Sequence, residues 1–297
     1  MIGIYFAGQL GNQMFRYACA RAIGEVRGDC NYVYGFINKK RSILDLNVKE
    51  GQIIEKDLVL AKGTLVQKIM YLLFKIIYKF IPVKDRNLIK APSFLVSKGL
   101  CLAGNNNDFS ITGTAFNERV FFNGTFESPL YFSNIRHILL QEFTPKHPLL
   151  GHNTELFDII RNNNSICISI RRGDFLDKAN KGWFEVCNKS YYLKAIELIK
   201  EKVDNPVFIF FSNDIEWVKA NIKIEGKCYY ESGNDPVWES LRLMSGCKHF
   251  IISNSTFHWW AQYLSTYDGK IVISPSRWYN APGPYPLILE SFYKIEV

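Results

Sequence analysis

The chain has 297 residues, of which 47% are hydrophobic and 22% charged, and it contains no low-complexity tract and no repeat period. This composition excludes a disordered or fibrous protein, and the length predicts two globular domains. The net charge is +8, and residues 1–150 carry all of the excess, with 19 Lys and Arg against 11 Asp and Glu. A basic domain attracts polyanions, but no helix-turn-helix, zinc-finger or RNA-binding signature is present, so we expect no nucleic-acid partner.

The cysteines and the start of the chain indicate a cytoplasmic protein. Seven cysteines is an odd number, and none forms a C-x-x-C pair. This pattern favours reduced thiols in the core over a disulfide framework or a zinc site. The chain runs from Met1 straight into an apolar segment with no basic stretch before it, so we expect no signal peptide.

The first half of the chain starts with alternating strands and helices. We expect, in order, a strand at Ile2–Phe6, a glycine-containing turn at Ala7–Gly11, a helix at Asn12–Val26 and a strand at Tyr32–Phe36. Residues 51–107 show no clear pattern. Because Pro145, Pro148 and Gly151 interrupt the chain, we place two domains at 1–148 and 149–297.

The second half alternates short apolar strands with helices. Such strands indicate a parallel sheet covered on both faces, which binds ligands at the carboxyl ends of its strands. The expected strands are Ile166–Ile170, Val207–Phe211, His249–Ser253 and Lys270–Ser274. The expected helices are Tyr191–Lys202, Ile215–Ile222, one that opens with Asp235 as N-cap and Pro236 as first residue, and Phe257–Leu264. The sequence therefore predicts an α/β fold with two domains and a cleft between them.

The segment 64–83 is an apolar helix with a stripe of lysines. Lys68, Lys75 and Lys79 fall within about 40° of one face at 100° per residue, and the rest of the cylinder is apolar or aromatic. The apolar run is too short to span a bilayer. Two interpretations remain open: a buried helix whose lysines alone meet solvent, and a helix that lies in the interface of an anionic membrane.

Arg171, Arg172, Gly173 and Asp174 follow an expected strand directly. Two guanidiniums at the carboxyl end of a strand suit phosphate oxygens, the glycine allows a sharp turn, and Asp174 can orient one Arg. The alternative is a surface turn with solvated arginines.

Three further turns carry polar side chains that suit a nucleotide. Ser253–Phe257 precedes a helix and offers either an anion site or ordinary N-capping by Ser255 or Thr256. Asp214, after Phe211–Asn213, either caps the next helix or accepts from a base. Gly8–Gln13 is a turn without the G-x-G-x-x-G spacing of a dinucleotide site, and it presents Asn12 and Gln13.

Motifs for metal-dependent and hydrolytic chemistry are missing from the sequence. There is no Asp-x-Asp, H-E-x-x-H, clustered His and Cys, G-x-S-x-G or Walker loop. We therefore expect a reaction without a metal, in which the two arginines neutralise a leaving diphosphate.

Four blocks that span nearly the whole chain identify a family. They are GQLGNQMFRYA at residues 8–18, SIRRGDF at 169–175, FSNDIEW at 211–217 and ISNSTFHWWA at 252–261. In this order they resemble glycosyltransferase family 11, the alpha-1,2-fucosyltransferases. Two positions depart from the family pattern, since Ser169 stands where many members have His and His258 stands where Ser is frequent.

The resemblance implies a fold of the GT-B type, with two Rossmann-like domains, and inverting transfer without a metal or other cofactor. GDP-fucose would be the donor, and the 2-hydroxyl of a terminal β-galactoside the acceptor, in the synthesis of a surface polysaccharide. The resemblance assigns the donor mainly to 149–297 and the acceptor to 1–148. The expected catalytic residues are Arg171, Arg172 and Asp174, and the expected donor-binding residues are Gly11, Asn12, Gln13, Ser212, Asp214, Asn254, Ser255, Thr256 and Phe257.

Two rival functions remain open. The first is a transferase that uses another GDP-sugar, and the second is a non-catalytic protein that binds a nucleotide sugar or a glycan. We expect a cytoplasmic enzyme, with peripheral contact to the inner face of an anionic membrane through 64–83.

Overall fold

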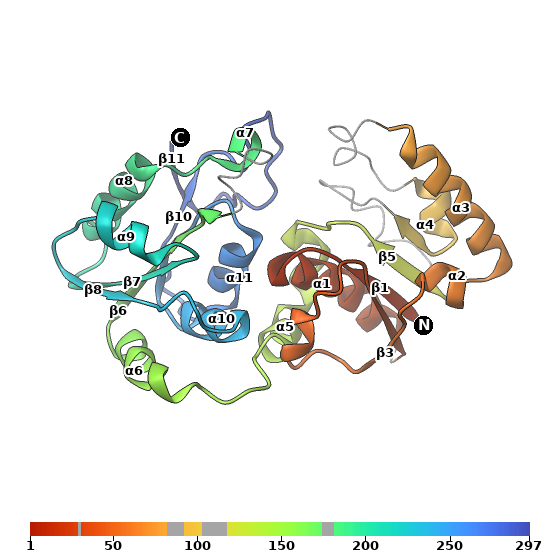
Figure 1. Ribbon diagram of the computed structural model, residues 1–297, viewed down its shortest axis with the longest axis horizontal. Coiled ribbons are helices and arrows are strands. Elements are labelled where there is room, and N and C mark those ends of the chain that lie inside the picture. The colour runs from red at the N-terminus through yellow and green to blue at the C-terminus, as the bar shows by residue number, and fades with distance from the viewer. Residues whose placement is uncertain (29–30, 82–91, 103–117, 174–180) are drawn as a thin grey trace. The chain divides into compact units, whose positions relative to one another are not determined.

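The computed structural model describes residues 1–28, 31–81, 92–102, 118–173 and 181–297. They form two compact units, Met1–Phe143 and Thr144–Val297 (Figure 1). The second unit thus starts at Thr144, a few residues before position 149 at which the sequence predicts its start. In the described residues every strand pairing of both units is parallel.

The first unit contains a five-stranded sheet of order β3-β2-β1-β5-β4. Its strands are β1 (Ile2–Phe6), β2 (Tyr32–Phe36), β3 (Gly51–Ile53), β4 (Leu100–Leu102) and β5 (Val120–Asn123). Its helices are α1 (Leu10–Arg27), α2 (Leu58–Lys62), α3 (Leu65–Lys79), α4 (Ser93–Ser97) and α5 (Arg136–Glu142).

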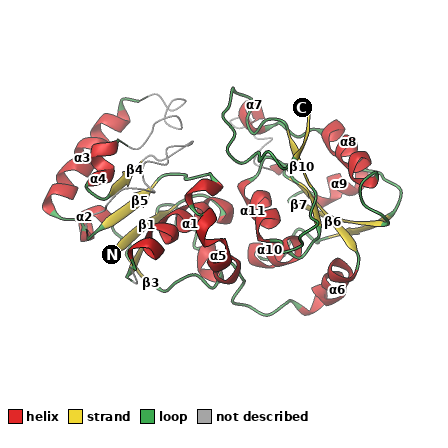
Figure 2. Cartoon of the chain, turned by 180° about the vertical axis from the view of Figure 1, so that it is seen from behind, coloured by secondary structure: helices red, strands yellow, loops and turns green. Residues whose placement is uncertain are grey.

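Helices cover both faces of this first sheet, with α1 and α5 on one face and α2, α3 and α4 on the other (Figures 1 and 2). A buried carboxylate joins α1 to α5, because Glu142 accepts hydrogen bonds from the Tyr17 hydroxyl at 2.6 Å and from Arg21 Nε at 3.0 Å. On the other face, Tyr5 of β1 and Tyr71 of α3 belong to one apolar cluster. The first unit therefore has a core on each side of its sheet.

The second unit contains a six-stranded sheet of order β11-β10-β9-β6-β7-β8. Its strands are β6 (Asn164–Ile170), β7 (Pro206–Ser212), β8 (Lys227–Tyr230), β9 (His249–Ile251), β10 (Val272–Pro275) and β11 (Tyr293–Ile295). Its helices are α6 (Thr154–Asn162), α7 (Lys181–Phe184), α8 (Lys189–Lys200), α9 (Ile215–Asn221), α10 (Val237–Ser245) and α11 (Thr256–Leu264). Figures 1 and 2 show α8 and α9 on one face and α10 and α11 on the other.

Most predicted elements of the second unit are confirmed within a few residues, but one predicted cap is wrong. Helix α10 begins at Val237 with Pro236 at the N-cap position. The Asp235 carboxylate instead accepts a hydrogen bond of 2.7 Å from the Asn153 side chain. Asp235 therefore ties α10 to the start of α6 rather than capping its own helix.

The helix predicted in segment 64–83 is confirmed as α3, but the interpretation of a buried helix is wrong. Only Gln67 and Tyr71 of this helix are buried, and most of its apolar side chains are exposed. Within the described ranges, no helix has the length and apolar character that crossing a bilayer requires.

Candidate functional site

The strand order of the second unit places a crevice between β6 and β9. Read from β8, the order is third, second, first, fourth, fifth and sixth strand of this unit, which is the doubly wound order of dinucleotide-binding domains. The chain leaves neighbouring strands β6 and β9 in opposite directions, and ligands bind outside the carboxyl ends of the strands at this switch point. Arg171 directly follows β6 there, and Ser253 lies two residues after β9.

A cavity of about 210 Å³ opens beside this switch point. It brings together three of the predicted site residues, Arg171, Arg172 and Asn254. The other residues that line it are Ile170, Phe184, Glu185, Val186, Cys187, Asn188, Lys189, Tyr192 and Trp217. Both arginines are half-buried in this wall rather than fully solvated.

Arg172 is held by contacts on three sides. Its backbone N–H donates to Asn213 Oδ1 at 3.0 Å, and its Nε donates to Asp214 Oδ2 at 3.0 Å. The guanidinium carbon lies 3.6 Å from the centroid of the Trp217 ring. A guanidinium that stacks on a ring and pairs with a carboxylate has its orientation fixed before a ligand arrives.

Gly173 allows the turn after Arg172 to approach β7 closely. Its φ is +21°, and a Cβ atom at this position would lie 2.1 Å from the Asn213 side-chain nitrogen. Any other residue would displace Asn213, which holds the Arg172 backbone. The glycine of the Arg-Arg-Gly-Asp block is therefore required by packing as well as by conformation.

Asp214 is the N-cap of α9, so the capping interpretation is confirmed. Its Oδ1 accepts from the Trp217 N–H at 3.3 Å while its Oδ2 holds Arg172. The Asp214 N–H donates in turn to Ser212 Oγ at 3.0 Å. Ser212 and Asp214 thus support the arginine, and their predicted contact with the nucleotide stays a prediction.

His258 is buried and neutral next to Arg171. Its Nδ1 lies 2.6 Å from Ser253 Oγ. Burial, helped by the positive charge of Arg171, lowers the pKa of His258 to about 3. His258 is therefore a packed residue, which is 6% exposed and carries no charge near neutral pH.

The segment Asn254–Phe257 starts α11. The Asn254 side chain donates to Phe184 O at 3.0 Å and to Trp278 O at 2.9 Å, so it braces the cavity wall. Ser255 occupies the N-cap position, but its side chain makes no capping hydrogen bond. The capping alternative is therefore wrong for Ser255, and the donor contacts of Ser255, Thr256 and Phe257 remain predictions.

Lys189 and the start of α8 are parts of the site that the sequence reasoning missed. Lys189 is the first residue of α8, and the Asn188 side chain caps this helix by accepting from the Tyr191 N–H at 2.9 Å. Helix N-termini attract anions through their free N–H groups and the helix dipole. The Asn188-Lys189 pair was the available signal, since Asn is a favoured N-cap, but we expected the helix to begin at Tyr191.

The predicted site residues of the first unit lie in the first turn of α1, so the turn predicted to extend to Gly11 ends earlier, before Leu10. Gln13 is fully buried, and its side chain bonds Gly8 O, Lys40 O and the Ile43 N–H at 3.0 to 3.1 Å. Gln13 therefore connects the turn before α1 to residues 40–43. Gly11 and Asn12 belong to the same helix, and Asp174 lies outside the described residues.

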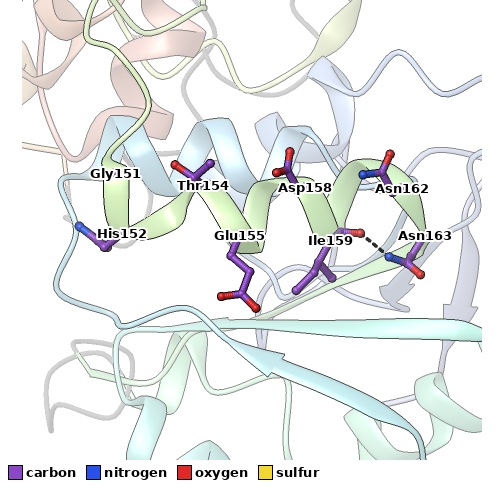
Figure 3. A pocket seen from close by; sticks show the side chains of 8 residues that line it. All are labelled: Gly151, His152, Thr154, Glu155, Asp158, Ile159, Asn162 and Asn163. Carbon is purple, nitrogen blue, oxygen red and sulfur yellow. Dashed lines mark hydrogen bonds between the residues drawn. The ribbon is translucent and has the colours of Figure 1, made fainter.

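A second hollow, of about 620 Å³, follows α6 and differs in charge from the first (Figure 3). Its lining includes the carboxylates Glu155 and Asp158, while Lys and Arg are missing from it. It is therefore unsuited to phosphate. Among the described residues, no three His, Cys, Asp or Glu side chains lie close enough to hold a metal ion.

The fold and the cavity define a class of protein with a doubly wound parallel sheet and a cation-lined cavity at its switch point. Three cationic side chains, Arg171, Arg172 and Lys189, and a helix N-terminus line one cavity. The sequence profile of glycosyl transferase family 11 matches residues 1–296, and the chain belongs to this family.

Three curated relatives are similar to parts of the chain. The alpha-1,2-colitosyltransferase of Escherichia coli is 35% identical over 168 residues, which cover 54% of this chain and 57% of that protein. The O-antigen biosynthesis glycosyltransferase WbnK of Escherichia coli is 32% identical over 46% of each chain. Human galactoside alpha-(1,2)-fucosyltransferase 1 is 28% identical over 46% of this chain and 41% of its own. The chain thus spans about half the length of the curated relatives that it matches.

A solved structure shares the fold. The structure of an Arabidopsis thaliana FUT1 variant in complex with GDP has a TM-score of 0.53 and 13% identity, and the match covers 91% of this chain and 69% of that one. The predicted fold, α/β with two Rossmann-like units of the GT-B type, is confirmed.

Proposed function

We propose that this protein transfers L-fucose from GDP-fucose to the 2-hydroxyl of a terminal β-galactoside, with inversion and without a metal ion. Family membership supports transfer of a sugar, and the alpha-1,2-fucosyltransferase and alpha-1,2-colitosyltransferase relatives support the linkage. The single observation that carries the proposal is the cavity at the switch point with Arg171, Arg172 and Lys189 in its wall.

In the proposed reaction the acceptor oxygen forms a bond to the anomeric carbon as the bond to the β-phosphate oxygen breaks. Negative charge then builds on the leaving GDP, and the acceptor hydroxyl loses its proton. Arg172, oriented by Asp214 and Trp217, donates to the diphosphate at this moment without having to reorganise. Arg171 and Lys189 supply further positive charge, which a metal ion supplies in other transferases.

The proton acceptor is not assigned to one residue. Three carboxylates lie near the Arg pair in the sequence: Glu185 lines the cavity, while Asp174 and Asp177 lie outside the described residues. A late loss of the proton to water makes a dedicated base unnecessary, because the oxocarbenium-like sugar is a strong electrophile.

The proposal divides the work between the units. The second unit holds GDP-fucose, the first unit binds the acceptor, and the donor contacts of Gly11 and Asn12 stay predictions. The O-antigen relative supports a polysaccharide or its glycolipid precursor as the acceptor, and we propose a cytoplasmic location.

The test is an initial-rate assay of Arg171→Ala with GDP-fucose and a β-galactoside. Removal of one well-placed charged donor typically costs about 10² to 10³ in rate, and we expect this loss with an unchanged circular dichroism spectrum. Arg161→Ala is the matched control, because Arg161 lies on the exposed side of α6 over the Phe157 ring. A folded Arg171→Ala protein that keeps most of its activity would contradict the proposal.

The second candidate function is transfer of a different sugar from its GDP-linked donor, and one curated relative favours it. The relative with 35% identity is a colitosyltransferase, and colitose is fucose without its 3-hydroxyl. Side-by-side transfer assays with GDP-fucose, GDP-mannose and GDP-colitose separate these donors. Binding of GDP-fucose without turnover on any galactoside would favour a non-catalytic binding protein instead.

A further inference from the structure

The outer surface of α3 is the largest apolar feature exposed by the described residues. Of the seventeen large hydrophobic side chains that are exposed there, eight belong to α3 and its C-cap. Their exposed fractions run from 45% for Leu72 to 84% for Phe80. The eight, called the α3 face below, are Leu65, Val66, Ile69, Leu72, Leu73, Ile76, Ile77 and Phe80.

The α3 face is one continuous stripe. At 100° per residue its members fall within an arc of about 140°. The two buried residues, Gln67 and Tyr71, lie on the opposite side of the cylinder. Eight large side chains on one stripe expose an area on the order of several hundred Å², which is as large as the largest patch on a typical soluble monomer and marks an interaction site.

Hydrogen bonds, rather than apolar packing alone, hold the inner side of α3 in place. The Gln67 side chain donates to Lys98 O and Arg119 O, both at 2.8 Å, and completes a capping box with Thr64. The Tyr71 hydroxyl donates to Asp57 Oδ2 at 2.7 Å. These polar contacts fix the rotation of the helix about its axis. Because they lie on the side opposite the α3 face, that face points outward.

The charged side chains of α3 itself are all of one sign. Lys68, Lys75 and Lys79 lie on one flank of the stripe, and the sequence has no Asp or Glu between Asp57 and Asp85. Lys75 is partly engaged, since its Nζ lies 3.6 Å from Asp57 Oδ2. A second copy of the chain fits this surface poorly, because self-association brings lysines together with no carboxylate on the helix to pair with them.

We propose that α3 lies in the interface of an anionic lipid bilayer, with the α3 face in the acyl boundary and the lysines at the level of the headgroups. This helix matches the amphipathic helices that lie flat in membrane interfaces, which combine an apolar stripe with flanking Lys or Arg. The lysines select anionic lipid. The contact would hold the first unit at the surface where lipid-linked glycans are exposed.

The experiment is co-sedimentation of the full chain with vesicles, without any substrate. One set of vesicles is phosphatidylcholine, and the other contains one part phosphatidylglycerol to three parts phosphatidylcholine. We expect clear binding to the anionic set, at least tenfold weaker binding to the neutral set, and weakening as salt rises from about 0.1 M to about 1 M, where the Debye length shrinks to about 3 Å.

Two pairs of variants separate the apolar and the charged contributions. Ile69→Glu with Ile76→Glu places two carboxylates in the middle of the stripe and should abolish binding to both sets of vesicles. Lys68→Glu with Lys79→Glu should weaken binding to the anionic set by about 25-fold or more, since each lysine near such a surface contributes a factor of about five. The matched control is Val26→Glu with Ile37→Glu, which adds the same charge at exposed apolar positions outside the α3 face and should bind as the parent does.

Three outcomes would overturn the proposal: no binding of the parent chain to anionic vesicles, equal binding of the parent and of the folded Ile69→Glu, Ile76→Glu protein, or a parent dimer that this variant breaks without vesicle binding by either. The readout needs no catalysis. Transfer to a soluble galactoside in the absence of vesicles should be the same for this variant and the parent, so loss of membrane binding is distinguishable from failure of the proposed activity.

Discussion

Replacing Asp214 separates two roles that one carboxylate performs. Its Oδ1 caps α9 by accepting from the Trp217 N–H, and its Oδ2 accepts from Arg172 Nε at 3.0 Å. In Asp214→Asn the cap survives, because Asn caps helices as well as Asp does, while the ion pair is lost. In Asp214→Ala both are lost.

The stability of the two variants follows from these contacts. The ion pair is partly exposed, with 23% and 40% of the two side chains open to solvent, so its loss should cost at most about 1 kcal/mol of unfolding free energy. Loss of the cap in Asp214→Ala should cost about 1 kcal/mol more. Urea denaturation of the parent and both variants measures these differences.

The activity of the two variants should fall together although their stability differs. Arg172 remains in both, stacked on Trp217 but no longer oriented by a carboxylate, and we expect kcat/KM for GDP-fucose to fall about tenfold in each. Initial rates at varied GDP-fucose and saturating acceptor measure this fall. Unchanged kcat/KM in two folded variants would refute the reasoning and leave Asp214 as a helix cap only.

Three further predictions follow from the second unit. Lys189→Ala should raise the KM for GDP-fucose about five- to tenfold with little change in stability, whereas Lys194→Ala, an exposed position on the same helix, should leave initial rates unchanged. Gly173→Ala should lose at least about tenfold in kcat/KM, because its Cβ would lie 2.1 Å from the Asn213 side chain; full activity in this assay would show that the turn relaxes without cost. Burial, together with the negative charge of Asp235, raises the pKa of Glu231 from 4.5 to about 6. Protonated Glu231 therefore contributes its full share to the unfolding free energy below pH 4.5, and this contribution is lost as the pH rises through 6. Glu231→Gln should therefore raise the unfolding free energy at pH 7 by up to about 2 kcal/mol, and identical denaturation curves at pH 7 would contradict the assigned pKa.

The strands nearest the site could be predicted from the sequence because they are short apolar segments, each followed by a turn with polar or charged residues. The strand Ile2–Phe6 has the predicted bounds, and the strand before Arg171 ends at Ile170 as predicted. In a parallel sheet buried on both faces the strands are largely apolar, so a strand ends where the apolar run ends, at Ala7-Gly8 after the first strand and at Arg171 after the second. The Arg pair was visible for the same reason.

The partners of the arginines could not be read from the sequence. Arg172 and Asp214 are 42 positions apart, and they meet because β6 pairs with β7 in a register that places Ile170 beside Ser212. Local patterns contain no information on such register. Lys189 was missed for a related reason, since its place in the cavity depends on where α8 lies across the sheet.

The α3 helix shows a different limit of sequence reasoning. An apolar helix with a narrow lysine stripe is typical of a buried helix, because the hydrophobic effect ordinarily turns the apolar side inward. In α3 the Gln67 side chain donates a hydrogen bond to Lys98 O and the Tyr71 hydroxyl donates one to Asp57, both on the inner side of the helix. Hydropathy measures how apolar a face is, but it does not show which face makes the hydrogen bonds that fix the helix.

The positive charge of the chain is distributed unequally between the unit with the cation-lined cavity and the unit with α3. The cations of the cavity, Arg171, Arg172 and Lys189, lie in residues 151–297, where 17 basic residues balance 17 acidic ones. The excess of eight positive charges in residues 1–150 is therefore not explained by the proposed diphosphate site. Four lysines of this half, Lys62, Lys68, Lys75 and Lys79, lie in or next to α3, which has the most exposed apolar side chains of any helix in the described residues. A chain that used its basic half for the nucleotide would concentrate charge around the cavity. This chain concentrates it beside an apolar stripe, which is the arrangement that an anionic bilayer binds.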